Sequence, residues 1–145
     1  MQKELRHSTQ LQLTRLIIFA LLFMMVGTAM ELYLLNHFED TLQLIPLICI
    51  GGSLLIFLIL FFRQTKPLLV LFKLILGLTA ASGLYGCFLH MKANFEFEQE
   101  MTPTGDTWDL LMESFSGALP ALAPASMIVL SLIGYAYLIL IKQKQ

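Results

Sequence analysis

This chain has few charged residues, no closely spaced pair of cysteines and no excess of basic residues. Of its 145 residues, 57% are hydrophobic and 13% are charged, which leaves no room for a soluble catalytic domain. With a formal net charge of −1, the chain lacks the excess of basic residues that is typical of a nucleic-acid-binding protein. Cys49 and Cys87 form no C-x-x-C pair, so the paired thiols of membrane thiol oxidoreductases are absent. We expect two free, membrane-buried cysteines, the alternative being a contact between them.

Four long apolar stretches are present instead, each close to the ~20 residues that cross a ~30 Å hydrocarbon core. They cover residues 16–36, 44–62, 68–91 and 118–141. The sequence therefore predicts an all-α, single-domain integral membrane protein folded as an up-down four-helix bundle. The first stretch exceeds the h-region of a signal peptide, and no small-x-small cleavage motif follows Gly27, so we interpret it as a retained helix.

The charges are segregated between the two ends of these stretches. Eight of the nine Lys and Arg residues flank one set of ends, and nine of the ten Asp and Glu residues lie on the other side. The positive-inside rule then places both termini and the second loop in the cytoplasm. Pro46 and Pro67 are expected in the first turns of the second and third helices, where a missing N–H is harmless.

The third connection, residues 92–117, is the longest and carries six of the acidic residues. Thr104-Gly105-Asp106 provides turn and N-cap chemistry. Four apolar side chains then recur at helical spacing: Trp108, Leu111, Met112 and Phe115. We expect a short amphipathic helix on the outer membrane surface, with Trp108 in the interfacial aromatic belt. Residues 94–98 alternate apolar and acidic side chains and predict either a strand-like turn or the frayed top of the third helix.

Glu31 is an acidic residue inside the first apolar stretch. It lies roughly 24 Å of helix rise beyond Arg15, still within a ~30 Å core, and an intramembrane carboxylate is a functional candidate by default. We expect it to face the bundle interior near Tyr85 and the segment from Pro120 to Pro124, whose prolines free backbone carbonyls and could line a polar pocket. These four residues form a candidate ligand site. The alternative is a shallow carboxylate that snorkels or fixes the bundle by a hydrogen bond.

His37 and His90 end the first and third helices at similar height, so we predict that their side chains lie within reach of one another. Two imidazoles could ligate a transition metal or a haem, with further oxygen ligands from Glu31, Glu39, Asp40 or Glu96. Hydrogen bonding at the membrane interface is the alternative, since no tight H-x-x-x-H or H-x-x-E cluster occurs. No other cofactor is expected.

The third helix carries small residues at four-residue steps, Ser82 and Gly86 followed by His90. Small residues at this spacing allow close helix packing, either inside the bundle or in a homo-oligomer.

Three parts of the chain resemble a group of small bacterial four-helix membrane proteins of unassigned function. They are the stretch from Glu31 to Asp40 with Gln43 and Pro46, residues 89–97, and the segment 117–124. The resemblance implies a bacterial inner-membrane protein with its marked positions at the outer rim, and it supplies no reaction.

Three functions fit these features, and we expect a non-enzymatic protein rather than an enzyme. The first is a non-enzymatic subunit or partner-binding component of an envelope complex, because the chain lacks soluble catalytic or energy-coupling machinery. The second is a small transporter or ligand-binding protein with an outward-facing polar site around Glu31. The third is a metal- or haem-binding redox protein that uses His37 and His90.

Overall fold

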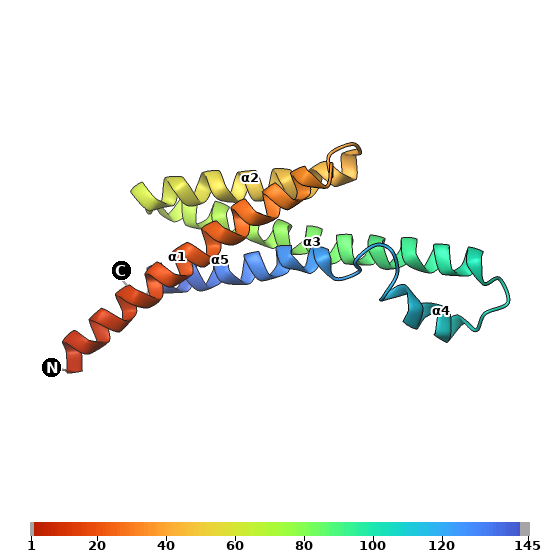
Figure 1. The fold of residues 1–145 in the computed structure, drawn as a ribbon. Coiled ribbons are helices and arrows are strands. Elements are labelled where there is room, and N and C mark those ends of the chain that lie inside the picture. The colour runs from red at the N-terminus through yellow and green to blue at the C-terminus, as the bar shows by residue number, and fades with distance from the viewer. Residues whose placement is uncertain (1, 143–145) are drawn as a thin grey trace.

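The computed structural model describes residues 2–142, with the side chains of residues 4 and 8–142. Three helices run side by side, α1 crosses them obliquely, and α1 begins at the end of the bundle where α5 finishes (Figure 1). The elements in chain order are α1 (Gln2–Leu34), α2 (Thr41–Phe62), α3 (Lys66–Met101), α4 (Thr107–Ser114), the 3₁₀ turn η1 (Ala123–Ala125) and α5 (Ser126–Lys142).

Four helical segments are long and apolar enough to span a membrane. They are Ser8–Leu34, Thr41–Phe62, Lys66–Met101 and Ala123–Lys142. The predicted all-α architecture, with four long helices packed as a bundle and a short helix between the third and fourth, is confirmed. We call the end that carries Arg15, Arg63, Lys66 and Lys142 the basic end, and the end that carries the acidic connections the acidic end.

Two helices are longer than the predicted spans. The first begins at Gln2 rather than at residue 16, and α3 continues to Met101 rather than ending at residue 91. No proline or glycine interrupts α3 between Gly86 and Pro103, so residues 94–98 are helical and the strand-like alternative is wrong. The 36 residues of α3 span about 54 Å, so the helix projects some 20 Å beyond a ~30 Å hydrocarbon core.

A capping box fixes the start of α2. The Asp40 carboxylate accepts from the backbone N–H of Thr41 (2.6 Å), and the Gln43 side chain accepts from the backbone N–H of Asp40 (3.3 Å). Because the helix therefore begins at Thr41, Pro46 lies inside it, and its predicted place in the first turn is wrong. Pro67 is confirmed in the first turn of α3.

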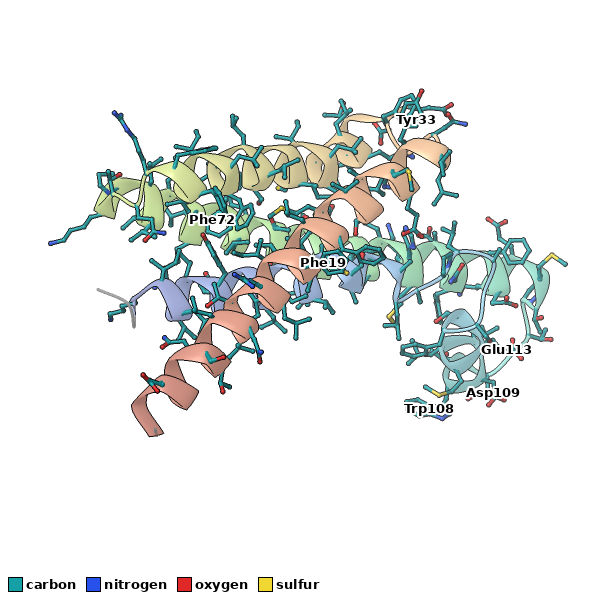
Figure 2. The ribbon with its side chains drawn as sticks, turned by 60° about the vertical axis from the view of Figure 1, so that its left-hand side comes forward. Phe19, Tyr33, Phe72, Trp108, Asp109 and Glu113 are labelled. Atoms are coloured by element: carbon teal, nitrogen blue, oxygen red, sulfur yellow. The ribbon has the colours of Figure 1, made fainter. Side chains whose placement is uncertain are left out.

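Helix α4 forms as predicted, with Asp106 as its N-cap. The carboxylate accepts from the backbone N–H of Trp108 at 3.0 Å. The helix packs against the projecting part of α3 and buries Leu110 and Ser114. The Trp108 indole remains 63% exposed and points away from the bundle (Figure 2), as an interfacial aromatic would. Contact with a membrane surface stays a prediction.

The fourth helix begins later than predicted, with η1 at Ala123 and α5 at Ser126 instead of residue 118. Gly117, Pro120 and Pro124 account for the delay, because proline cannot supply an interior helical N–H. Residues 115–122 consequently form an irregular connection that lies over α3.

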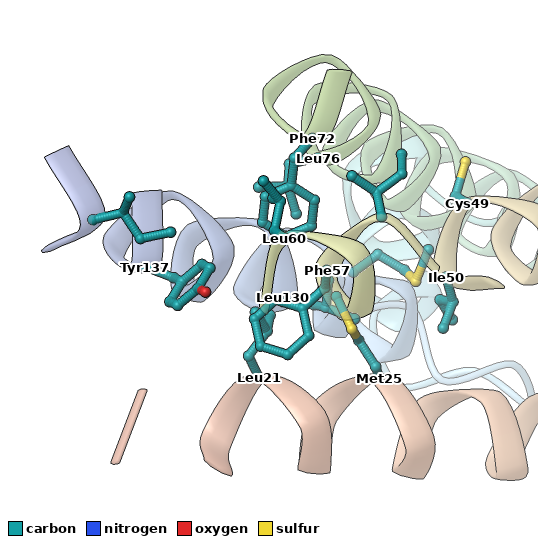
Figure 3. Close-up of a cluster of buried hydrophobic side chains, with 13 residues drawn as sticks. Leu21, Met25, Cys49, Ile50, Phe57, Leu60, Phe72, Leu76, Leu130 and Tyr137 are labelled. Carbon is teal, nitrogen blue, oxygen red and sulfur yellow. The ribbon is translucent and has the colours of Figure 1, made fainter. Parts of the chain in front are cut away.

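Side chains from all four long helices meet in one core (Figure 3). Its centre is an aromatic group in which the Phe57 ring lies 6.1 Å from Phe72 and 5.0 Å from Tyr137. The buried Ser131 hydroxyl ties α5 to α3 by donating to the Leu76 carbonyl at 2.8 Å. The remaining fully buried apolar members include Leu21, Met25, Ile50, Leu60 and Leu130. Cys49 and Cys87 are free thiols, as predicted.

Candidate functional site

Asn94 holds the irregular connection against α3 at the acidic end. Its side chain is 3% exposed, and its Nδ2 donates to the carbonyls of Ser114 (2.8 Å) and Leu119 (2.7 Å). The Oδ1 atom accepts from the Leu119 N–H at 3.0 Å. Gly117 permits this approach, because a Cβ there would lie 2.5 Å from Asn94 Cγ. One amide thus replaces the backbone partners that a helix would have provided.

His90 provides a second link between α3 and this connection. Its Nδ1 lies 3.1 Å from the Pro120 carbonyl oxygen, which can only accept. Nδ1 therefore carries a proton in this contact. The same carbonyl accepts from the Ala123 N–H at 3.1 Å. The carbonyl predicted to lack an intrahelical partner is thus satisfied by an imidazole from the neighbouring helix, as membrane proteins with interrupted helices require.

His37 lies near enough to His90 for the charge of His90 to act on it, and the predicted contact between the two side chains stays a prediction. His37 lies in the turn after α1, where its backbone N–H donates to the Leu32 carbonyl at 2.9 Å. Asn36 makes the turn possible with a positive φ of 51°, which asparagine tolerates better than most residues. Partial burial lowers the pKa of His37 below its usual 6.5, and the positive charge of His90 lowers it further.

This lowered pKa predicts that acid destabilises the fold. Below pH 6.5 the unfolded chain takes up a proton on His37 more readily than the folded chain, so the free energy of unfolding falls as the pH falls. We expect the unfolding midpoint in detergent to drop between pH 7.5 and pH 5.0, and His37→Gln to reduce that drop. An unchanged pH dependence in the variant would contradict the assignment.

The predicted oxygen ligands do not complete a metal site around these imidazoles. Among the described side chains, those of residues 4 and 8–142, no group of three or more His, Cys, Asp or Glu residues is placed to hold a metal ion. A pair of histidines at the acidic end is therefore what the fold offers. The hydrogen-bonding role is observed directly for His90.

Glu31 does not face the bundle interior, and that expectation is wrong. Its side chain is exposed on α1, and among the described residues its carboxylate makes no hydrogen bond or ion pair. Leu34, the last residue of the same helix, and Leu35, directly after it, are 70% and 68% exposed. Because α1 crosses the bundle obliquely (Figure 1), the roughly 24 Å of helix between Arg15 and Glu31 covers less depth along the bundle axis. Glu31 therefore lies among exposed apolar side chains rather than beyond them.

An apolar stripe runs along the exposed face of α1 toward Glu31. Its members are separated by alternating steps of three and four residues, the spacing of a helix-packing seam. Each is more than half exposed: Leu16, Phe19, Phe23, Val26, Met30 and Tyr33. We call this set the α1 stripe; Figure 2 labels Phe19 and Tyr33 on it. Within an apolar window of 18 residues in each span, 17% of the α1 residues are buried, against 33%, 22% and 39% in the other three spans.

The other members of the predicted ligand site lie elsewhere. Tyr85 is 48% exposed, with its ring stacked on Phe88 at 6.4 Å. Pro124 packs into the small-residue face of α3, where a Cβ on Gly83 would lie 2.8 Å from the Pro124 carbonyl oxygen. The same proline lies 2.8 Å from the corresponding position of Gly86. The small-residue face of α3 therefore packs inside the bundle. This was one of its two predicted uses, the other being contact in a homo-oligomer.

Sequence reasoning missed Asn94 and the α1 stripe. A carboxamide in a helix facing a Gly-and-Pro-rich segment was the available signal for Asn94. The stripe could not be separated from the buried side of α1, because Leu21 and Met25 recur at the same spacing. No known protein family, curated protein or solved structure matches this chain.

Proposed function

We propose that this protein is a non-enzymatic membrane subunit that binds the transmembrane helix of a different protein along the α1 stripe. The observation that carries the proposal is that Glu31 is exposed on the same span as the stripe, about 100° around the helix from Met30. A carboxylate facing lipid is costly, up to about 2.5–3.5 kcal/mol at the centre of a span. A partner that covers Glu31 removes this cost, which lipid chains cannot do.

Gly27 gives the proposed partner room to approach. It lies one turn before Glu31 on α1, and a Cβ placed on it would meet no atom within 4 Å. Small residues at helix interfaces in membranes allow backbones to come close, which strengthens packing and interhelical hydrogen bonds. The Gly27–Glu31 pair thus combines open space with a polar anchor.

Charge argues that the partner is not a second copy of this chain. Among the described residues, Lys92 is the only Lys or Arg on the acidic side of the spans, and its Nζ already pairs with Glu96 at 3.4 Å. A second copy would bring another Glu31 and no free cation at that level. We therefore expect a partner helix that presents Lys or Arg to Glu31, since intramembrane charges are usually paired.

Two glycine variants provide the test. Gly27→Leu fills the proposed contact point, and Gly51→Leu fills an equally open position on α2, where a Cβ also meets nothing within 4 Å. After gentle detergent extraction from the native membrane, the wild type and Gly51→Leu should migrate as a complex larger than the 16.4 kDa chain. Gly27→Leu should migrate as the single chain while keeping its unfolding midpoint.

Substitution of Glu31 separates charge from shape. Glu31→Ala should dissociate the same complex, whereas Glu113→Ala, an exposed carboxylate on α4, should not. A wild-type mass equal to one chain or to a multiple of 16.4 kDa would contradict the proposal, as would a complex that survives both Gly27→Leu and Glu31→Ala.

The sequence supports a bacterial inner-membrane setting for this subunit, with the basic end in the cytoplasm by the positive-inside rule. The transporter alternative loses support because Glu31, Tyr85 and Pro124 do not line a common interior site. The redox alternative rests on the electrostatic effect of His90 on His37 alone.

A further inference from the structure

A notch lined by residues of α1, α2 and α5 lies at the basic end of the bundle. At this end the oblique course of α1 takes the helix away from α2 (Figure 1). The cavity has a volume of about 170 Å³. Residues of three helices and of the turn after α2 line it: Thr14, Ile18, Phe61, Gln64, Tyr137 and Ile141. It is at the opposite end from Glu31 and plays no part in the partner contact proposed above.

The shape and lining of the notch suit a chain-like amphiphile. Ile18, Phe61 and Ile141 provide apolar wall, while Thr14 and Gln64 add polar atoms. The volume is below the roughly 300 Å³ at which small-molecule pockets begin, so a compact solute would not be enclosed. A segment of a single acyl chain needs no such enclosure, because the rest of it stays in the bilayer.

Two cations are next in the sequence to residues that line the notch. Arg15 follows Thr14 directly and Arg63 precedes Gln64; both are exposed, and neither takes part in an ion pair among the described side chains. Lys66 and Lys142 lie at the same end. Guanidinium groups bind phosphate oxygens in bidentate fashion, and basic residues at a membrane surface attract anionic lipids.

We propose that the notch is a binding site for one anionic phospholipid of the leaflet at the basic end. The phosphate is held by Arg15 and Arg63. The first part of one acyl chain lies against Ile18, Phe61 and Ile141. Anionic rather than zwitterionic lipid is specified because Arg15 and Arg63, next in sequence to the lining residues, have no counterion among the described side chains.

Native mass spectrometry of the full chain, titrated with phosphatidylglycerol or with phosphatidylcholine of the same acyl chains, tests this site. We expect one phosphatidylglycerol to be retained in preference to phosphatidylcholine. Arg15→Gln combined with Arg63→Gln should weaken its binding roughly thirtyfold, about fivefold for each basic residue at the surface. Lys92→Gln, which removes a cation from the acidic end, should leave binding unchanged.

Two further arms fix the source of the phosphate and the role of the cavity. Excess inorganic phosphate should not displace the lipid, because it lacks the acyl chain. Ile18→Trp, which fills the notch and keeps both arginines, should abolish retention. Equal binding of the two lipids, or full retention by the double arginine variant, would overturn the proposal, as would displacement by phosphate or retention by Ile18→Trp.

Discussion

Replacing Asn94 by alanine should free the irregular connection and α4 from α3. The substitution removes three hydrogen bonds, to the backbone of Ser114 and Leu119, and leaves backbone groups without their partner in a site that excludes water. At about 1 kcal/mol for each bond, the local loss is about 3 kcal/mol, a factor of about 100 in the opening equilibrium. Limited proteolysis of residues 102–122 should accelerate by about that factor.

Asn94→Asp sharpens this prediction, because the carboxylate keeps the size of the side chain but cannot donate. The carboxylate oxygens would face the carbonyl oxygens of Ser114 and Leu119, and neither group can donate a hydrogen bond. The Asn94→Asp variant should therefore be cleaved at least as fast as Asn94→Ala. Gln99→Ala, an exposed position on the same helix, is the matched control. If Asn94→Ala were cleaved at the rate of Gln99→Ala, the proposed clamp would not exist.

Adding one methyl group at Gly83 should destabilise the whole bundle. A Cβ there would lie 2.8 Å from the Pro124 carbonyl oxygen and 2.9 Å from the Met127 Cβ, and these atoms cannot move aside as a flexible side chain would. Overpacking of this kind costs about 1–3 kcal/mol, which exceeds the gain of about 1 kcal/mol from replacing a helical glycine by alanine. The midpoint of unfolding in detergent should fall.

Gly51→Ala, a substitution at an open position, should not lower the midpoint of unfolding. A Cβ there meets nothing within 4 Å, so only the helix preference remains and the variant should be neutral or stabilised by up to about 1 kcal/mol. Equal midpoints for Gly83→Ala and Gly51→Ala would contradict the close packing of Pro124 on α3. Gly83→Val should be worse than Gly83→Ala, since two further methyl groups enter the same contact.

Much of this architecture is readable from the sequence because long apolar stretches of about 20 residues allow few structures in a membrane. Asp106 as an N-cap also follows from local chemistry. The start of α2 was missed because the Asp40–Gln43 capping box outweighs the preference of Pro46 for a first turn.

The site was harder to predict than the fold. Depth along a helix can be counted, but the direction in which Glu31 points depends on how α1 rotates and tilts against its neighbours. Both faces of α1 are apolar, so hydrophobic pattern alone cannot decide which one packs on α5 and α2. The oblique course of α1 depends on packing between helices that are far apart in the sequence. Which side chains form the exposed α1 stripe is therefore known only once this packing is known.

Photo-cross-linking in the native membrane tests the partner contact most directly. A photoreactive residue replaces Met30 of the α1 stripe, which is 58% exposed, or Leu78 of α3, which is 63% exposed and lies outside the stripe. The account predicts a discrete protein adduct from Met30, lost on Glu31→Ala, and none from Leu78. The same adducts from both positions, or no protein adduct from Met30, would contradict it.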